Sequence, residues 1–198
     1  MFLVERLFGV GVFAALLAIV CLLIARKNSH YGIILFMYNI CLAIMGFFNV
    51  PYVTQDIYRI NEIMRYFAKF SFKKFWSMGV AESTTKAANI YYWLIGKTGI
   101  LQLLPFITSL ITYSCIFYII CNYAKKYDIS RQNIAVTVLF VMSSGTYMYT
   151  ITGIRTMLSL SLICFCFYRE TVEKKYSVWH LPIYAIACLL HNFAFAMM

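Results

Sequence analysis

The sequence predicts an all-α integral membrane protein: a bundle of about six transmembrane helices with an amphipathic segment outside the membrane. Of its 198 residues, 63% are hydrophobic and only 12% are charged, which does not suit a surface that faces water. Several uncharged runs of about 20 residues are long enough, as helices, to cross ~30 Å of hydrocarbon. Basic residues gather between these runs, as expected for loops on the cytoplasmic side.

The first two apolar runs predict a helical hairpin. The run 7–25 is followed at once by Arg26 and Lys27, a pattern that indicates a stop-transfer helix rather than a cleaved signal peptide. A second uncharged run covers 31–50. The short polar link between them predicts that the two helices are antiparallel neighbours.

Segment 51–97 is different in character, with seven basic and three acidic residues. Apolar residues recur at helical spacing, opposite Arg65 and Lys69; they are Ile57, Ile60, Ile63, Met64 and Phe67. We therefore expect residues 56–75 to form an amphipathic helix that lies on the membrane surface. Residues 87–96 are rich in aromatic side chains, which favours an interfacial belt or a re-entrant hairpin.

The second half predicts four more spanning helices. A third run covers 98–123, with Pro105 near its start, where a first-turn proline is tolerated. Residues 132–168 are apolar except for Arg155 and are long enough for two helices, with a turn at 143–152, so that Arg155 starts the fifth. Run 176–198 is the sixth. Residues 1–198 then form one membrane domain, and because the sequence stops inside an apolar run, we expect a fragment of a longer protein.

The distribution of basic residues predicts the orientation. With the N-terminus outside, the inner loops hold eight Lys and Arg residues, and the outer ones hold only Arg6 and Arg155. The formal charge of +10 is then explained by inner loops and anionic headgroups, without nucleic acid as a partner. Six of the seven cysteines lie in apolar runs and no CxxC pair is present, so we interpret them as packing residues.

Four residues on the predicted outer side are candidates for chemistry: Asp56, Arg59, Arg155 and His191. A guanidinium in an apolar stretch, such as that of Arg155, either faces a cavity, partner or anionic ligand, or snorkels to the headgroups. His191 is either a catalyst or a hydrogen-bonded packing residue. Asp56 and Arg59 can share one helix face, and the plainer interpretation is a helix N-terminal acid beside a surface arginine.

Three motifs carry a resemblance to a known family. They are Asp56-Ile57-Tyr58-Arg59, Gly153-Ile154-Arg155 followed by Leu158 and Ser159, and Ala187-Cys188-Leu189-Leu190-His191. In this order and spacing the chain resembles bacterial polysaccharide polymerases of the EpsG and Wzy type, over most of its length. Two positions depart from the family pattern: Thr156 stands where glutamine is usual, and Ser159 stands where alanine is usual.

The resemblance implies a glycosyltransferase-type polymerase in the bacterial inner membrane that joins sugar repeat units carried on polyprenyl pyrophosphate. Arg155 and Arg59 would bind the pyrophosphate, and Asp56 or His191 would accept the proton of the acceptor hydroxyl. We expect no cofactor and no required metal. Its partners would be the lipid-linked oligosaccharide, membrane lipids and other export proteins. Three alternatives stay open: a transporter of lipid-linked sugars, a membrane O-acyltransferase, suggested by His191-Asn192, and a non-catalytic membrane protein.

Overall fold

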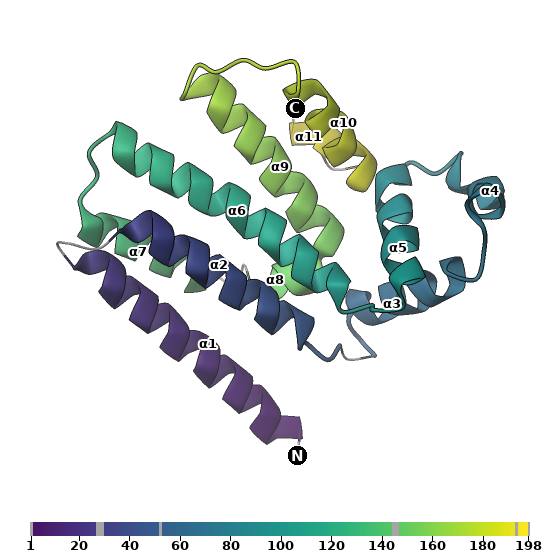
Figure 1. Ribbon diagram of the computed structural model, residues 1–198, viewed down its shortest axis with the longest axis horizontal. Coiled ribbons are helices and arrows are strands. Elements are labelled where there is room, and N and C mark those ends of the chain that lie inside the picture. The colour runs from purple at the N-terminus through teal and green to yellow at the C-terminus, as the bar shows by residue number, and fades with distance from the viewer. Residues whose placement is uncertain (1, 27–29, 52, 144–146, 193, 198) are drawn as a thin grey trace. The chain divides into compact units, whose positions relative to one another are not determined.

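The computed structural model describes residues 2–26, 30–51, 53–143, 147–192 and 194–197, and every regular element in these ranges is a helix (Figure 1). The all-α prediction is therefore confirmed. The chain divides into two compact units. The first consists of Met1–Tyr38 and Phe117–Thr146, and the second of Asn39–Ile116 and Tyr147–Met198.

The first unit contains α1 (Phe2–Ala25), the start of α2 (Tyr31–Phe47), the end of α6 (Leu103–Lys126) and α7 (Arg131–Val141). Helix α1 packs against α7. The Ser130 hydroxyl caps α7 by accepting from the Asn133 amide, which satisfies one of the free N–H groups of the first turn. Arg131 donates to the Arg26 carbonyl at 3.0 Å, so the loop that follows α6 is held to the end of α1.

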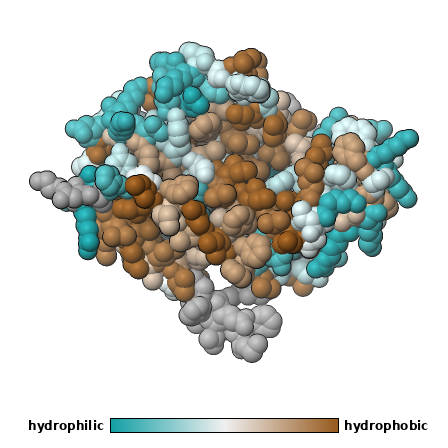
Figure 2. All heavy atoms as spheres, viewed as in Figure 1, coloured by the Kyte–Doolittle hydropathy of each residue, from teal (hydrophilic) through white to brown (hydrophobic). Residues whose placement is uncertain are grey.

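The second unit contains the remaining helices. They are α3 (Asp56–Phe67), α4 (Phe72–Phe75), the π-helical turn η1 (Trp76–Val80), α5 (Lys86–Thr98), α8 (Tyr147–Thr152), α9 (Ile154–Thr171), α10 (His180–Leu190) and α11 (Ala194–Met197). Helix α9 packs along α10, and α5 packs against both α3 and α10. Figure 2 shows apolar residues covering the helices, with hydrophilic residues at the loop between α9 and α10 and around α3 to α5.

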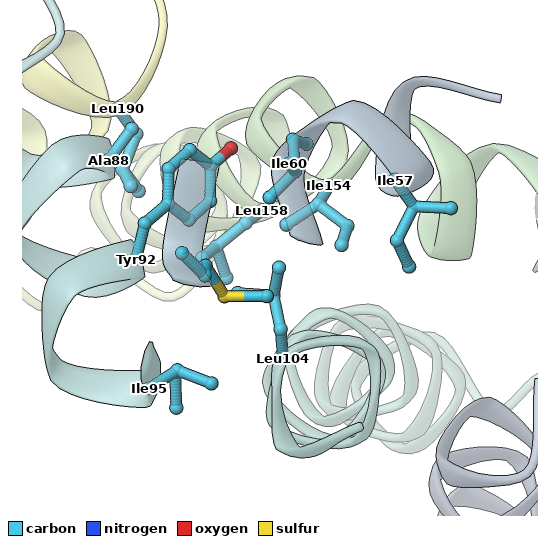
Figure 3. Close-up of a cluster of buried hydrophobic side chains, with 10 residues drawn as sticks. Ile57, Ile60, Ala88, Tyr92, Ile95, Leu104, Ile154, Leu158 and Leu190 are labelled. Carbon is cyan, nitrogen blue, oxygen red and sulfur yellow. The ribbon is translucent and has the colours of Figure 1, made fainter. Parts of the chain in front are cut away.

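Helix α3 is amphipathic, as predicted, but its apolar stripe is buried in protein. Ile57, Ile60 and Met64 are at most 4% exposed. They join a core cluster with residues of α5, α6, α9 and α10 (Figure 3). This stripe is therefore occupied by packing within the second unit, which leaves little of it to lie on a membrane.

The expectation of one helix over 56–75 is wrong, because the chain turns at 68–71. In a continuous helix, Phe67 and Phe75 would be two turns, or about 12 Å, apart. The turn brings their ring centroids to 5.0 Å in an edge-to-face contact, and Phe75 is completely buried. Burial of this aromatic residue thus outweighs helix continuity.

Among the described residues, α6 is the one helix long and apolar enough to cross a membrane; its 24 residues span about 36 Å. Helix α9 has 18 residues but carries Arg155, Arg169 and Glu170. Helices α7 and α10 have 11 residues each, or about 16 Å, and are shorter than the predicted runs. Of the predicted turn at 143–152, residues 144–146 lie outside the described residues, and residues 147–152 form α8.

The predicted continuous helix over 176–198 is also wrong. Helix α10 ends at Leu190, and His191 is extended, with φ −151° and ψ 127°. Just beyond this end, the Asn192 side-chain amide donates to the Thr84 hydroxyl at 3.0 Å, a tertiary hydrogen bond. The start of α10 is tied to α9 by polar contacts, since His180 Nδ1 lies 2.7 Å from Glu170 Oε1.

The backbones of α3 and α5 approach each other closely at Gly96. A Cβ placed on Gly96 would lie 2.5 Å from the Met64 carbonyl oxygen, which is backbone and cannot rotate away. Gly96→Ala should therefore push α3 from α5 and lower the free energy of unfolding by about 1–3 kcal/mol. Thermal unfolding of the detergent-purified protein measures this loss.

Gly32→Ala is the matched control. Gly32 is also helical, and a Cβ there meets nothing within 4 Å, so its melting temperature should not fall. Equal melting temperatures for Gly96→Ala and the unmodified protein would contradict the close approach.

Candidate functional site

The Asp56–Arg59 pair lies in the first turn of α3. The acid is at the helix N-terminus, where the helix dipole favours negative charge. Arg59 Nη2 contacts Asp56 Oδ1 at 3.1 Å, which confirms that the two residues share one face. Both side chains are more than half exposed, so this contact adds little stability and leaves both groups accessible to a ligand.

Arg155 is the second residue of α9, which confirms that it starts a helix. Its neighbours Ile154 and Leu158 are buried in the core cluster, and Arg155 itself is half-buried. No hydrogen bond or ion pair joins Arg155 to another part of the described chain. A cation at a helix N-terminus adds to the positive end of the helix dipole, so this position attracts an anion.

Tyr92 of α5 is a site residue that the sequence analysis missed. It is 3% exposed, and its hydroxyl group has no hydrogen-bond partner within the described residues. In Figure 3 the hydroxyl oxygen points toward Ile60 of α3. Burial raises the pKa of Tyr92, and the positive charge of Arg155 opposes this rise. The group is therefore a neutral donor at physiological pH.

Tyr92 links three of the four predicted residues, because Arg155, Asp56 and Arg59 all act on it electrostatically. His191 is half-buried and directly follows Leu190, which belongs to the same core cluster. The charges of Asp56, Arg59 and Arg155 are thus within electrostatic range of one buried hydroxyl group. That His191 joins them in one outward cavity remains a prediction.

These groups suit an anionic ligand. Two guanidinium groups and a tyrosine hydroxyl are hydrogen-bond donors, and Asp56 is a carboxylate that can accept a proton. Within the described ranges, no group of three or more His, Cys, Asp and Glu side chains is placed to hold a metal ion. The seven cysteines form no disulfide within the described residues.

A groove of about 380 Å³ lies in the first unit. It contains none of the four predicted residues. Its lining is basic and polar; the residues are His30, Tyr31, Gly32, Ile33, Cys121, Asn122, Lys125 and Arg131.

Comparison of the chain with protein-family models, with curated proteins and with solved structures found no match.

Adjacent tyrosines provide a test of the unpartnered hydroxyl group. The Tyr91 hydroxyl lies 3.2 Å from the Thr108 hydroxyl and 3.4 Å from the Leu104 carbonyl, whereas that of Tyr92 has no partner in the described part of the chain. Tyr91→Phe should lower the free energy of unfolding by about 1 kcal/mol, while Tyr92→Phe should leave it unchanged or raise it. Unfolding of both variants in the same detergent measures the difference. An equal loss in Tyr92→Phe would mean that its hydroxyl is already satisfied.

Proposed function

We propose that this chain belongs to a multi-pass membrane enzyme that polymerises lipid-linked sugar repeat units at the outer face of the bacterial inner membrane. The observation that carries the proposal is Arg155: a half-buried guanidinium at a helix N-terminus, with no carboxylate partner among the described residues and within electrostatic range of the buried Tyr92 hydroxyl, which has no partner there either. Such a position favours a ligand with concentrated negative charge, and a pyrophosphate group fits this requirement.

The proposed reaction is a glycosyl transfer. The hydroxyl group of the acceptor sugar attacks the anomeric carbon of the donor, a new C–O bond forms, and the bond to the pyrophosphate oxygen breaks. Arg155 and Arg59 stabilise the negative charge that develops on the leaving polyprenyl pyrophosphate. Asp56 or His191 accepts the proton that the acceptor hydroxyl loses.

We propose that the chain crosses the membrane about six times, with its N-terminus and the segment 51–97 outside. Support comes from α6 and from the eight-to-two distribution of basic residues between the loops. The short helices α7 and α10 fit this topology as parts of interrupted spanning segments, which are tolerated where the irregular backbone is buried in protein or lines a cavity.

Cysteine labelling tests the topology. In a variant without native cysteines, Lys126→Cys should be protected from a membrane-impermeant maleimide in intact cells and react after permeabilisation. Lys69→Cys, in the proposed outer segment, should react in intact cells. Labelling of Lys126→Cys from outside would refute this orientation.

The polymerase proposal is tested by substitution of Arg155. Arg155→Lys keeps the charge but loses the planar group that binds two phosphate oxygens, so polymer formation should fall by a factor of about ten or more. Arg155→Ala should abolish it. Polymer amount and length are measured in cells whose only copy is the variant, with the level of membrane-inserted protein measured in parallel.

Arg59 has a matched control on the same helix. Arg59→Ala should reduce polymer formation, whereas Arg65→Ala should not, although Arg65 also forms an exposed i,i+3 pair, with Glu62 at 2.6 Å. Full activity of Arg155→Ala at a normal protein level would disprove the proposal. Translocation of the lipid-linked substrate without bond formation, in purified and reconstituted protein, would favour the transporter instead.

A further inference from the structure

Two aromatic side chains are exposed where α4 leads into η1. The rings of Phe72 and Trp76 are stacked, with centroids 5.9 Å apart and planes at 29°. Phe72 is 49% exposed, Trp76 is 37% exposed, and the neighbouring Met78 is 38% exposed. In water, this apolar surface is unfavourable unless something covers it.

The exposed pair rests on a fixed aromatic base. Phe75 is fully buried and stacks on Trp93 of α5 at 5.7 Å, and the edge of Phe72 contacts Trp93 at 5.3 Å. Trp93 Nε1 donates to the Phe70 carbonyl at 3.2 Å. Through these contacts the exposed Phe72 ring packs on the Phe75–Trp93 stack, so its position is fixed by tertiary structure.

The charged side chains of residues 69–80 are all positive. Lys69, Lys73 and Lys74 are exposed, and residues 69–80 contain no acid. The ammonium group of Lys74 lies 5.0 Å from the centre of the Phe70 ring. Aromatic residues with adjacent lysines are typical of the membrane interface, where rings lie among the headgroups and ammonium groups contact phosphates.

We propose that this aromatic–lysine tip, made of Lys69, Phe72, Lys73, Lys74, Trp76 and Met78, binds the headgroup region of a bilayer that contains anionic phospholipid. A carbohydrate is the other partner that stacks on aromatic rings, but residues 69–80 contain no carboxylate or side-chain amide to accept hydrogen bonds from its hydroxyl groups, and their charged side chains are all lysines. The charge therefore matches a phosphate surface. The proposed membrane contact at this tip is a different surface from the apolar stripe of α3, which the sequence predicted to lie on the membrane and which is buried in protein.

The chain contains three tryptophans, at positions 76, 93 and 179, so fluorescence can isolate the tip. The Trp179→Phe variant retains Trp76 and Trp93, and the Trp76→Phe/Trp179→Phe variant retains only Trp93. Both keep the Trp93 hydrogen bond, so the difference between their emission reports Trp76 alone. The full chain is reconstituted in vesicles of phosphatidylethanolamine and phosphatidylglycerol, with bromine on the acyl chains of one lipid or the other.

Trp76 emission should be quenched at least about twofold more than Trp93 emission, and more by brominated phosphatidylglycerol than by the same fraction of brominated phosphatidylethanolamine. Replacing Lys73 and Lys74 together by alanine should remove this preference for phosphatidylglycerol while circular dichroism stays unchanged. Quenching of Trp76 by aqueous iodide with no effect of brominated lipid would overturn the proposal. Protection of Trp76 from iodide by a soluble oligosaccharide in lipid-free detergent would overturn it in favour of a carbohydrate surface.

Discussion

The close packing of α3 on α5 is the constraint on which the candidate site depends. Gly96 lets the two backbones meet at Met64, and the core cluster extends from this contact to the start of α9. Arg59 precedes the buried Ile60, and Arg155 follows the buried Ile154. The relative positions of Arg59 and Arg155 are therefore set by the packing of the apolar residues next to them. A site built in this way keeps its geometry without direct bonds among all of its members.

Hydropathy and charge predicted the helix boundaries that coincide with a change in the polarity of the local sequence. The end of α1 at Ala25, the long apolar α6 and the start of α9 at Arg155 all lie at or close to a change in local polarity. The break after Phe67 and the end of α10 at Leu190 were not predicted, because isolated polar residues such as Lys69 and the pair His191-Asn192 do not by themselves end a helix. They depend on tertiary contacts, the Phe67–Phe75 ring contact and the Asn192–Thr84 hydrogen bond, which no local pattern contains.

The candidate site, like the fold, was predicted only where the local sequence shows it. Arg155 is identifiable because a charge in an apolar sequence is unusual, and the Asp56–Arg59 pair is identifiable from its i,i+3 spacing. Tyr92 is one of 16 tyrosines, and in the sequence it has no feature that separates it from Tyr91. Its importance comes from burial without a hydrogen-bond partner, which only the three-dimensional structure can show. One sequence signal was present: Ala88, Tyr92 and Ile95 have the helical spacing of a buried face.

The proposed anion-binding role of Arg155 explains more than snorkelling does. Snorkelling explains a guanidinium near a helix end, but it gives no role to a buried tyrosine hydroxyl beside it. An unmade hydrogen bond at Tyr92 costs about 1–3 kcal/mol, and a cation at a helix N-terminus costs about 0.3–1 kcal/mol. Both costs are offset together if an anion binds between α3 and α9, since it accepts from the hydroxyl group and neutralises the guanidinium. A single phosphate-bearing ligand thus accounts for two unfavourable features that are otherwise unrelated.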